Sequence, residues 1–503
     1  MTDLAFSDAN ISTIGTFAVN GYTISAPIFT NEEAEKIVGS ITWYAAEYFD
    51  GSYRAFETLT KSYALWADPN YPLRQKALPI LSGISGFSED SIICFGLEPL
   101  GQMVLELDTL TQLHTRLIEL VESGRFAQFT RWQNGHIKGY GIPKLVVQKR
   151  PAQIVHNVAG NVVGASWLST MLGAIAQARQ FVKLPFRDLA SFMFYLQTVG
   201  ELDPAFRDTI ACGYYEGGGE VEDDILKASD IVFAMGSDQT MDALQHKLDR
   251  LNPPARLLKH GWNLSFHVVG KAYAIPEVAE LAAWGAVAHD GNACFSPANV
   301  YIERGGRLSP QQFAETMAEH MAALAERIPP KQSFAVAERV TSYRQNQLKR
   351  KLLGEDVRVI KSRNTDYTII LDHEDPNLIP TCQERTVIVK PVDDINSVPQ
   401  YISHLAGNLQ TVGLAVPPGD ILDIADQLGA QGVTNIRMLG TEYVIDLLEC
   451  HDGLFNTAQM FMSDDLRWLN VRYTDTDQAV EEALRIKETT LANLAASKER
   501  ILR

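Results

Sequence analysis

The sequence predicts an α/β protein built on doubly wound parallel sheets. Strand-like and helix-like segments alternate from residue 150 to 260, beginning with a strand at 154–158 and a helix at 164–179. The alternation resumes with a strand at 299–303 and a helix at 310–327. Alternation at this spacing implies parallel strands joined by right-handed crossovers. Ligands bind such sheets at the carboxyl ends of the strands.

Composition narrows the class of protein. The chain has 503 residues, enough for two or three domains, and its net charge of −17 disfavours a nucleic-acid partner. No apolar run is long enough to span a bilayer, and the N-terminus lacks the basic region of a signal peptide. The five cysteines are scattered and lack zinc-site spacing. We therefore expect a cytoplasmic protein without a disulfide framework or a metal.

The first 130 residues predict a helical lead-in that merges with the next domain. Thr30 and Glu33 have the spacing of a capping box, for a helix that would run to about residue 49. Further helical patterns cover 71–82 and 106–122, and nothing in this region suggests catalysis. Glycine and proline punctuate short apolar runs between 126 and 147, which predicts a hairpin or an arm at 131–150.

Two segments could bind phosphate, although the usual G-x-G-x-x-G fingerprint is absent. Gly236 and Ser237 end a predicted strand and open a helix, where free N–H groups and the helix dipole favour an anion. Gly218 lies in a glycine turn, residues 216–220, that would allow close backbone approach. A plain helix cap and a plain loop remain the alternatives.

Cys294 occupies a tight turn between a predicted helix at 277–288 and the strand at 299–303. Gly291 lets the chain leave the helix, and Pro297 prevents a new one. A side chain at such a turn can be presented to a cleft, and a thiolate of lowered pKa is a strong nucleophile. The alternative is a small buried thiol.

The sequence Asn-Ala-Cys-Phe-Ser-Pro after an alanine-rich helix resembles the nucleophile loop of the aldehyde dehydrogenase superfamily. It is most similar to the acyl-CoA reductases that supply aldehyde in bacterial luminescence. The resemblance covers about residues 130–475 and implies two doubly wound α/β domains with a small β arm for oligomerisation. The implied domains are an NAD(P)-binding domain at 151–259, a catalytic domain at 260–450, and a C-terminal strand and helix at 451–503 that join subunits.

The same resemblance assigns cofactor contacts. It implies that Lys183 lies near the adenosine ribose and that the Gly236–Ser237 turn meets the pyrophosphate. Arg187 would meet the 2′-phosphate of NADPH, and Glu384 the nicotinamide ribose. A plain strand-end lysine and a surface carboxylate are the alternatives for Lys183 and Glu384.

Asn161 and His260 are the other candidate catalytic residues. The resemblance implies that the Asn161 amide and the Cys294 N–H stabilise an oxyanion. Hydrolytic aldehyde dehydrogenases carry a water-activating glutamate where this chain has His260. Its loss fits a reductase, because hydrolysis would waste the acyl-enzyme. His260 could act as an acid or base, or could make only a structural hydrogen bond.

We therefore expect NADPH-dependent reduction of a fatty acyl-CoA or acyl-carrier thioester to an aldehyde. The expected protein is a homo-oligomer, with acyl-transferring enzymes as further partners. Two alternatives stay open: an NAD(P)-dependent enzyme that oxidises aldehydes to acids, and an inactive nucleotide-binding scaffold. Residues 468–473 predict a strand that could join a neighbour's sheet, and 476–503 predict one charged helix.

Overall fold

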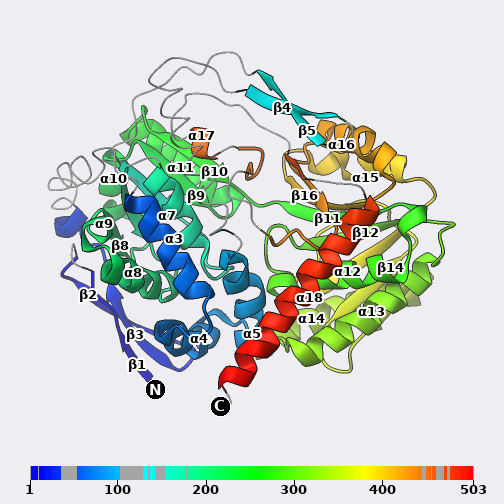
Figure 1. Cartoon of the computed structure of the whole chain (residues 1–503), viewed down its shortest axis with the longest axis horizontal. Helices are drawn as coiled ribbons and strands as arrows, with labels where there is room; N and C mark the ends of the chain where they lie inside the picture. Colours follow the sequence, from blue (N-terminus) through cyan, green and yellow to red (C-terminus); the bar gives the residue numbers. More distant parts are fainter. Residues whose placement is uncertain are drawn as a thin grey trace.

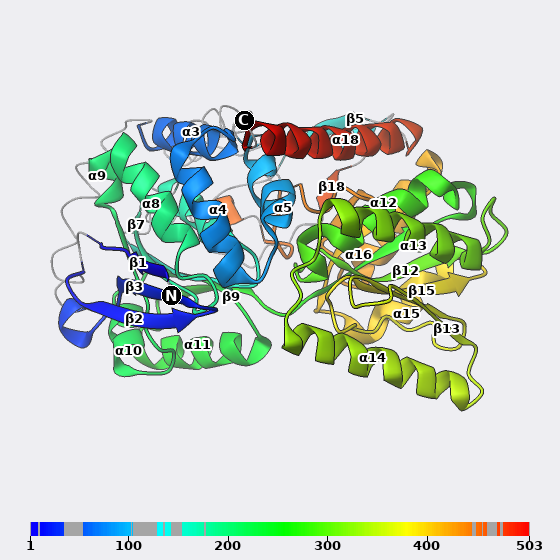
Figure 2. The same ribbon diagram turned by 90° about the horizontal axis from the view of Figure 1, so that it is seen from below.

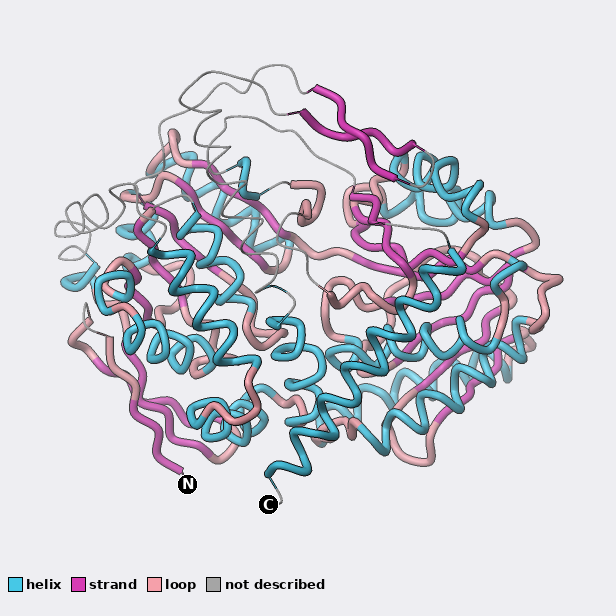
Figure 3. Tube along the Cα trace, viewed as in Figure 1, coloured by secondary structure: helices cyan, strands magenta, loops and turns pink. Residues whose placement is uncertain are grey.

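Two large sheets, each with helices on both faces, lie side by side in a computed structural model of the chain (Figures 1 and 3). This arrangement confirms the doubly wound α/β prediction. The structure describes residues 2–8, 11–34, 54–101, 103, 128–133, 136–141, 153–175, 178–444, 449–454, 456–459, 470–472 and 476–501.

The first large sheet has five parallel strands in the order β10-β9-β6-β7-β8. Its strands are β6 (Gln153–Asn157), β7 (Arg179–Lys183), β8 (Ile210–Gly213), β9 (Ile231–Met235) and β10 (Arg256–His260). Its helices are α7 (Ala165–Ile175), α8 (Ser191–Leu202), α9 (Pro204–Arg207), α10 (Glu220–Lys227) and α11 (Asp238–Leu251). The chain runs outward from β6 to β8, then returns to the other side of β6 at β9. This reversal creates a crevice at the carboxyl ends of β6 and β9, where such sheets bind ligands.

The second large sheet has eight strands in the order β13-β14-β15-β12-β11-β16-β17-β18. Its strands are β11 (Leu264–Val269), β12 (Pro297–Glu303), β13 (Val357–Lys361), β14 (Thr368–Asp372), β15 (Thr386–Val392), β16 (Leu409–Ala415), β17 (Asn435–Met438) and β18 (Asn470–Arg472). Its main helices are α12 (Pro276–Val287), α13 (Pro310–Arg327), α14 (Phe334–Leu352), α15 (Val398–Ile402) and α16 (Ile421–Ala430). Only β13 pairs antiparallel among these described strands.

Local chemistry explains why α13 begins where it does. The Ser309 hydroxyl accepts a hydrogen bond from the Gln312 N–H, and the Gln312 side chain accepts one from the Ser309 N–H. Pro310 fills the first helical position, where no N–H is needed. Phe313, Met317 and other apolar residues at helical spacing are buried against the sheet.

The N-terminal segment differs from the prediction of a purely helical lead-in. Residues 2–27 form a three-stranded sheet of β1 (Thr2–Ala5), β2 (Ile14–Val19) and β3 (Tyr22–Pro27), followed later by α3 (Arg54–Ala67) and α4 (Pro72–Ser85). The helical prediction is wrong for these strands. They are short, and β2 is only half-buried on one face, so the apolar pattern that marks a strand is weak here. The isolated bridge from Ile28 to Tyr214 connects this segment to the end of β8.

The capping box predicted at Thr30 is only half formed. The Thr30 hydroxyl accepts the Glu33 N–H at 3.3 Å. The Glu33 carboxylate instead accepts the N–H groups of Ser12 and Thr13, at 2.6 Å each. It therefore joins the residues just before β2 to the helix start. The predicted helix beyond residue 34 and the one at 106–122 lie outside the described residues.

The hairpin predicted near residue 135 is present as β4 (Gln128–Gln133) paired antiparallel with β5 (His136–Gly141). Its role in joining subunits stays a prediction. β18 pairs with β17 of its own chain at the edge of the eight-stranded sheet, and its joining of a neighbour's sheet also stays a prediction. The predicted C-terminal helix is α18 (Thr476–Ile501).

Helix α18 lies across both halves of the molecule (Figure 2). In the second half, the Lys487 ammonium pairs with Glu280 of α12. In the first half, the Asn493 amide donates to the Glu98 carboxylate at 3.0 Å. Across the described residues no single helix is long and apolar enough to cross a membrane. Helix α4 and residues 89–101 are long and apolar enough when taken together, but the chain bends by 112° between them.

Candidate active site

A cavity of about 750 Å³ lies where the two large sheets meet. The carboxyl ends of β9 and β10 contribute Met235 and His260, and the amino ends of β11 and β12 contribute Leu264 and Pro297. The short linker from His260 to Leu264 carries the chain from one sheet to the other. The cavity therefore lies between the ligand-binding edge of one sheet and the opposite edge of its neighbour, within the usual size range of ligand pockets.

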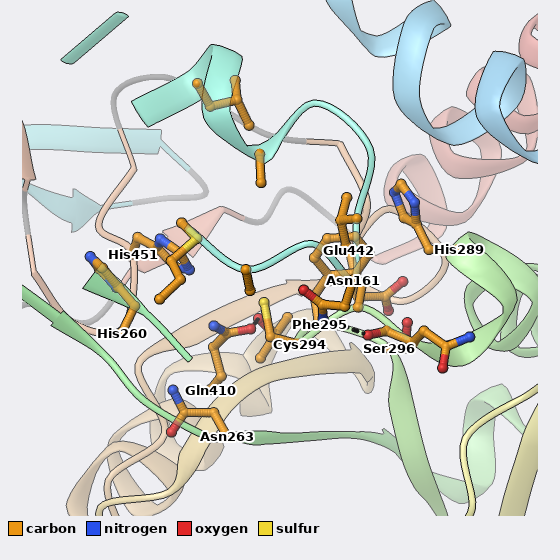
Figure 4. Close-up of a pocket in the computed structure, with 18 of the residues that line it drawn as sticks. Asn161, His260, Asn263, His289, Cys294, Phe295, Ser296, Gln410, Glu442 and His451 are labelled. Atoms are coloured by element: carbon orange, nitrogen blue, oxygen red, sulfur yellow. Dashed lines mark hydrogen bonds between the residues drawn. The ribbon is translucent and has the colours of Figure 1, made fainter. Parts of the chain in front are cut away.

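Cys294 is exposed and lies centrally in this cavity, between His260 and His451 on one side and Asn161 and Ser296 on the other (Figure 4). The turn predicted around it is present between α12 and β12. Ser265 fixes the backbone there: its hydroxyl donates to the Cys294 carbonyl at 2.7 Å and accepts the Thr411 N–H at 3.1 Å.

The other four cysteines, all within the described residues, are less available. Cys94 and Cys212 are buried. Burial raises the pKa of the Cys382 thiol, and it raises the pKa of Cys450 to about 12. Exposure in the cavity therefore distinguishes Cys294 from the rest.

The chain leaves α12 through an unusual backbone. His289, Asp290 and Gly291 have φ values of 49°, 53° and 72°. The prediction that Gly291 ends this helix with positive φ is confirmed, and two residues without glycine's freedom share that conformation. Each costs about 1–3 kcal/mol, a strain that is typical of functional sites. Burial lowers the pKa of His289 to about 4, so its ring is neutral near neutral pH.

Asn161 comes from the first half of the molecule and reaches the nucleophile turn. It follows β6, and its side-chain amide donates to the Asn292 carbonyl at 3.0 Å. The structure thus brings Asn161 within two residues of Cys294, although 133 positions separate them in sequence.

His260 ends β10 and is buried, 3% exposed. Its Nδ1 lies 2.8 Å from the Asp452 carboxylate, and its ring stacks on His451 with centroids 4.2 Å apart. Asp452 also accepts hydrogen bonds from Asn263 and from Gln410 of β16. One carboxylate therefore ties the first sheet, the linker and the second sheet together.

Asp452 was not predicted as a site residue. Burial alone would raise the pKa of its carboxyl, but the neighbouring His451 and His260 outweigh burial and hold the pKa well below its usual range. The ligand atoms of His260, His451 and Asp452 lie within 4.8 Å of one another, close enough to hold a metal ion. The two imidazole planes are nearly parallel, at 15°, which disfavours one ion lying in both planes. The absence of a metal stays a prediction.

One arm of the cavity is apolar. It lies between η1 (Ile92–Leu97), the residues that follow η1, and α7. The apolar side chains are Phe95, Leu97, Leu100, Met103, Trp167, Leu168, Met171, Leu172 and Phe295. Segment η1 is a π-helix, a rare conformation that often marks functional sites. Sequence reasoning missed this wall because an apolar run inside a helical region is equally typical of a core.

The predicted cofactor residues Lys183 and Gly218 meet at one carboxylate. The Glu222 side chain lies 3.7 Å from the Lys183 ammonium, 2.9 Å from the Lys247 ammonium, and accepts the Gly218 N–H at 2.9 Å. Lys183 ends β7 and lies 4.5 Å from the centre of the Tyr215 ring. Burial lowers the pKa of Lys183, and Glu222 opposes that shift.

Gly236 and Ser237 line the cavity at the crevice beside β6. The Gly236 N–H donates to the His260 carbonyl at 3.1 Å, and the Ser237 hydroxyl caps α11 by accepting the Thr240 N–H at 3.2 Å. Ser237 therefore caps a helix, which is the alternative given above to phosphate binding, and it also lines the cavity. Arg187 is exposed.

The residues expected to meet a dinucleotide lie along the carboxyl edge of the five-stranded sheet, where Gly236 and Ser237 line the cavity and Lys183 and Gly218 lie outside its lining. A Cβ added to Gly218 would meet no atom within 4 Å, so the turn is open. A Cβ added to Gly217 would lie 3.2 Å from the Lys183 ammonium, so glycine keeps that approach clear. These residues fit a nicotinamide dinucleotide, with Lys183 and Gly218 at one end and Gly236 and Ser237 nearer Cys294.

Glu384 does not line the cavity, although its neighbour Gln383 does. Its carboxylate pairs with Arg339. Burial raises the pKa of Glu384, and the Arg339 guanidinium opposes that shift. Its assignment to the nicotinamide ribose stays a prediction that this placement does not favour.

Several solved structures that resemble this chain are aldehyde dehydrogenases. Aldehyde dehydrogenase 21 from Physcomitrella patens has a TM-score of 0.63 at 10% identity, with 96% of each chain covered. Methylmalonate-semialdehyde dehydrogenase from Oceanimonas doudoroffii has a TM-score of 0.64 at 11% identity, covering 94% of this chain and 99% of that one. An NAD-dependent benzaldehyde dehydrogenase from Corynebacterium glutamicum scores 0.59 at 14% identity, covering 87% and 92%. The molecule therefore has the aldehyde dehydrogenase fold.

Sequence comparison makes the assignment narrower. The family model described as acyl-CoA reductase (LuxC) matches residues 56–463. The chain belongs to this family and is an oxidoreductase that acts on acyl-CoA or aldehydes. No curated protein matches the chain.

Proposed function

We propose that this enzyme reduces a fatty acyl thioester, carried by CoA or an acyl-carrier protein, to the aldehyde through an acyl group on Cys294. The observation that carries the proposal is the exposed thiol of Cys294 at the junction of the two sheets. The family assignment and the apolar arm beside Phe295 support it. Burying a chain of methylenes there would contribute about 0.8 kcal/mol per CH₂ to binding.

In the first half-reaction the Cys294 thiolate attacks the thioester carbonyl. The bond from carbon to the carrier sulfur breaks, and the carrier leaves as a thiol after taking up a proton. The Cys294 N–H and the Asn161 amide are the proposed oxyanion donors. Asn161 already lies beside the turn, and rotation away from the Asn292 carbonyl would free its N–H groups for substrate.

In the second half-reaction the acyl group on Cys294 is reduced. When bound, NADPH would supply the hydride. Cleavage of the bond between carbon and the Cys294 sulfur then releases the aldehyde and restores the thiolate. The residues proposed to hold the cofactor are Lys183, Arg187, Gly218, Gly236, Ser237 and Glu384.

The absence of a glutamate at position 260 supports reduction over oxidation to an acid, because the acyl-enzyme then lacks that water-activating base. Glu442 is a carboxylate on the cavity, but both of its oxygens accept the Gly440 N–H, and it lies 3.1 Å from His267. These contacts hold it in place and leave it less suited to activate water. We further propose a cytoplasmic homo-oligomer that uses the β4–β5 hairpin.

The test is a panel of acyl-CoA thioesters of different chain length, assayed with NADPH and NADH. We expect aldehyde as the product, a preference for long chains, and faster turnover with NADPH. Free acid as the main product, formed from aldehyde and an oxidised nicotinamide, would support the oxidative alternative. No turnover with any thioester would support an inactive scaffold.

A further inference from the structure

Two left-handed turns face each other directly behind the nucleophile turn. The first is His289–Gly291, which follows α12, and the second is residues 383–385, which precede β15. In the second turn φ is 62° at Gln383, 53° at Glu384 and 53° at Arg385. Side chains other than glycine rarely adopt this conformation, so surrounding contacts must hold both turns in place.

Arg385 and Asp290 supply those contacts. The Arg385 N–H donates to the Asp290 carbonyl at 2.9 Å, and the Arg385 guanidinium donates to the Asp290 carboxylate at 2.7 Å. The guanidinium also donates to the Ile328 carbonyl at 2.9 Å. The two side chains are 1% and 5% exposed. Removing one partner would leave a buried charge unpaired, so this pair strongly favours one arrangement of the turns.

The backbone approach between the turns is also specific. A Cβ added to Gly291 would lie 3.1 Å from the Arg385 nitrogen, so a larger residue would push the turns apart. Cys294 lies only three residues beyond Gly291, and its carbonyl is fixed by Ser265 on the other side. The Asn292 amide, between them, donates to the Asp290 carbonyl at 3.2 Å. A shift at Asp290 would therefore reach the thiol.

We propose that Asp290 and Arg385 form a positioning pair that sets the Cys294 thiol and N–H toward the reacting carbonyl. For its effect on catalysis, the proposal rests on the proposed function of Cys294. It predicts that the pair acts on the rate of reaction at sulfur rather than on the binding of substrate.

The test compares Asp290→Asn with the unchanged protein. Alkylation of Cys294 by iodoacetamide and kcat for acyl-CoA reduction should both fall by about 10- to 100-fold, because small displacements of a reacting group have effects of that size. KM for acyl-CoA should change by less than about twofold, since the apolar arm is untouched.

Asp372→Asn is the matched control. Asp372 is a buried carboxylate paired with Arg350 at 2.7 Å. It lies at the far end of β14 from Thr368, whose N–H donates to the Arg385 carbonyl. We expect this control to lower thermal stability while leaving Cys294 alkylation and kcat within about twofold. If Asp290→Asn behaves like the control in both rates, the positioning role is overturned.

Gly291→Ala tests the same idea without removing a charge, should Asp290→Asn fail to fold. It should also slow alkylation and reduce kcat with little change in KM. Alkylation at the unchanged rate in this variant would overturn the proposal. Alkylation does not require a thioester substrate. An unchanged protein that fails to reduce thioesters would therefore refute the proposed function, while the alkylation comparison would still decide the positioning role.

Discussion

The two sheet edges that border the cavity differ in how they are built. The carboxyl edge of the five-stranded sheet is open: Gly218 and Ser237 are exposed, and Lys183 contacts the shared Glu222 carboxylate and the Tyr215 ring. The amino edge of the eight-stranded sheet is locked by the buried Asp290–Arg385 pair and by Ser265. An edge with room suits a cofactor that exchanges at each turnover, and a locked edge suits a nucleophile that must stay aligned.

The largest expected effect is at the locked edge. Cys294→Ala should lower kcat for acyl-CoA reduction by at least about 1000-fold, because it removes the nucleophile itself. Cys382→Ala, at a half-buried cysteine that does not line the cavity, is the control and should retain activity. Steady-state aldehyde formation measures both, and full activity in the Cys294 variant would remove the basis of the comparison.

Substitution of Asn161 tests whether a residue from the open edge contributes to the reaction at Cys294 on the locked edge. Asn161→Ala should reduce kcat by about 100- to 1000-fold through loss of one oxyanion donor. Asn157→Ala, at the end of β6 and away from the cavity lining, should have a much smaller effect. Equal losses in the two variants, measured as kcat, would show that Asn161 only supports the local fold.

At the open edge we expect a smaller effect that is confined to the cofactor. Lys183→Gln should raise KM for NADPH by about tenfold, the size expected for one lost hydrogen bond to a charged group. KM for acyl-CoA should not change. Lys259→Gln, an exposed lysine on β10, is the control. A rise in KM for acyl-CoA instead would place Lys183 outside the cofactor site.

The last prediction concerns stability at the locked edge rather than catalysis. Burial lowers the folded-state pKa of His289 to about 4, whereas the unfolded chain protonates near 6.5. Between these values the unfolded state binds more protons, so the free energy of unfolding should fall as pH is lowered from 6.5 to 4, by on the order of 3 kcal/mol. His289→Asn should weaken this dependence, and the exposed His246→Asn should not. Urea unfolding at several pH values measures the slopes, and an unchanged slope in His289→Asn would contradict the assignment.

Much of the fold was predictable because its signals are local. The strands from β6 to β9 and the helices between them follow from alternating apolar runs, and α13 follows from the same alternation after β12. The Cys294 turn was predictable because Gly291 and Pro297 restrict the backbone on either side. The positions of Lys183 and Ser237 at strand ends were predictable because the ends of strands also have local sequence signals.

The missed features depend on contacts that are distant in sequence. Asp452 meets His260 across 192 positions, and no local pattern distinguishes it from other acidic residues. The left-handed turn at residues 383–385 contains no glycine, so only its contact with Asp290 explains it. The apolar wall at η1 belongs to a region predicted to lack site residues, because lining a cavity and filling a core require the same side chains.

The most direct test of the account is the mass of the peptide that contains Cys294. After incubation with a long-chain acyl-CoA and no nicotinamide, we predict that one acyl group is attached to this cysteine. Addition of NADPH should remove it and release an equal amount of aldehyde. An acyl group found on another cysteine, or one that NADPH does not remove as aldehyde, would contradict the account.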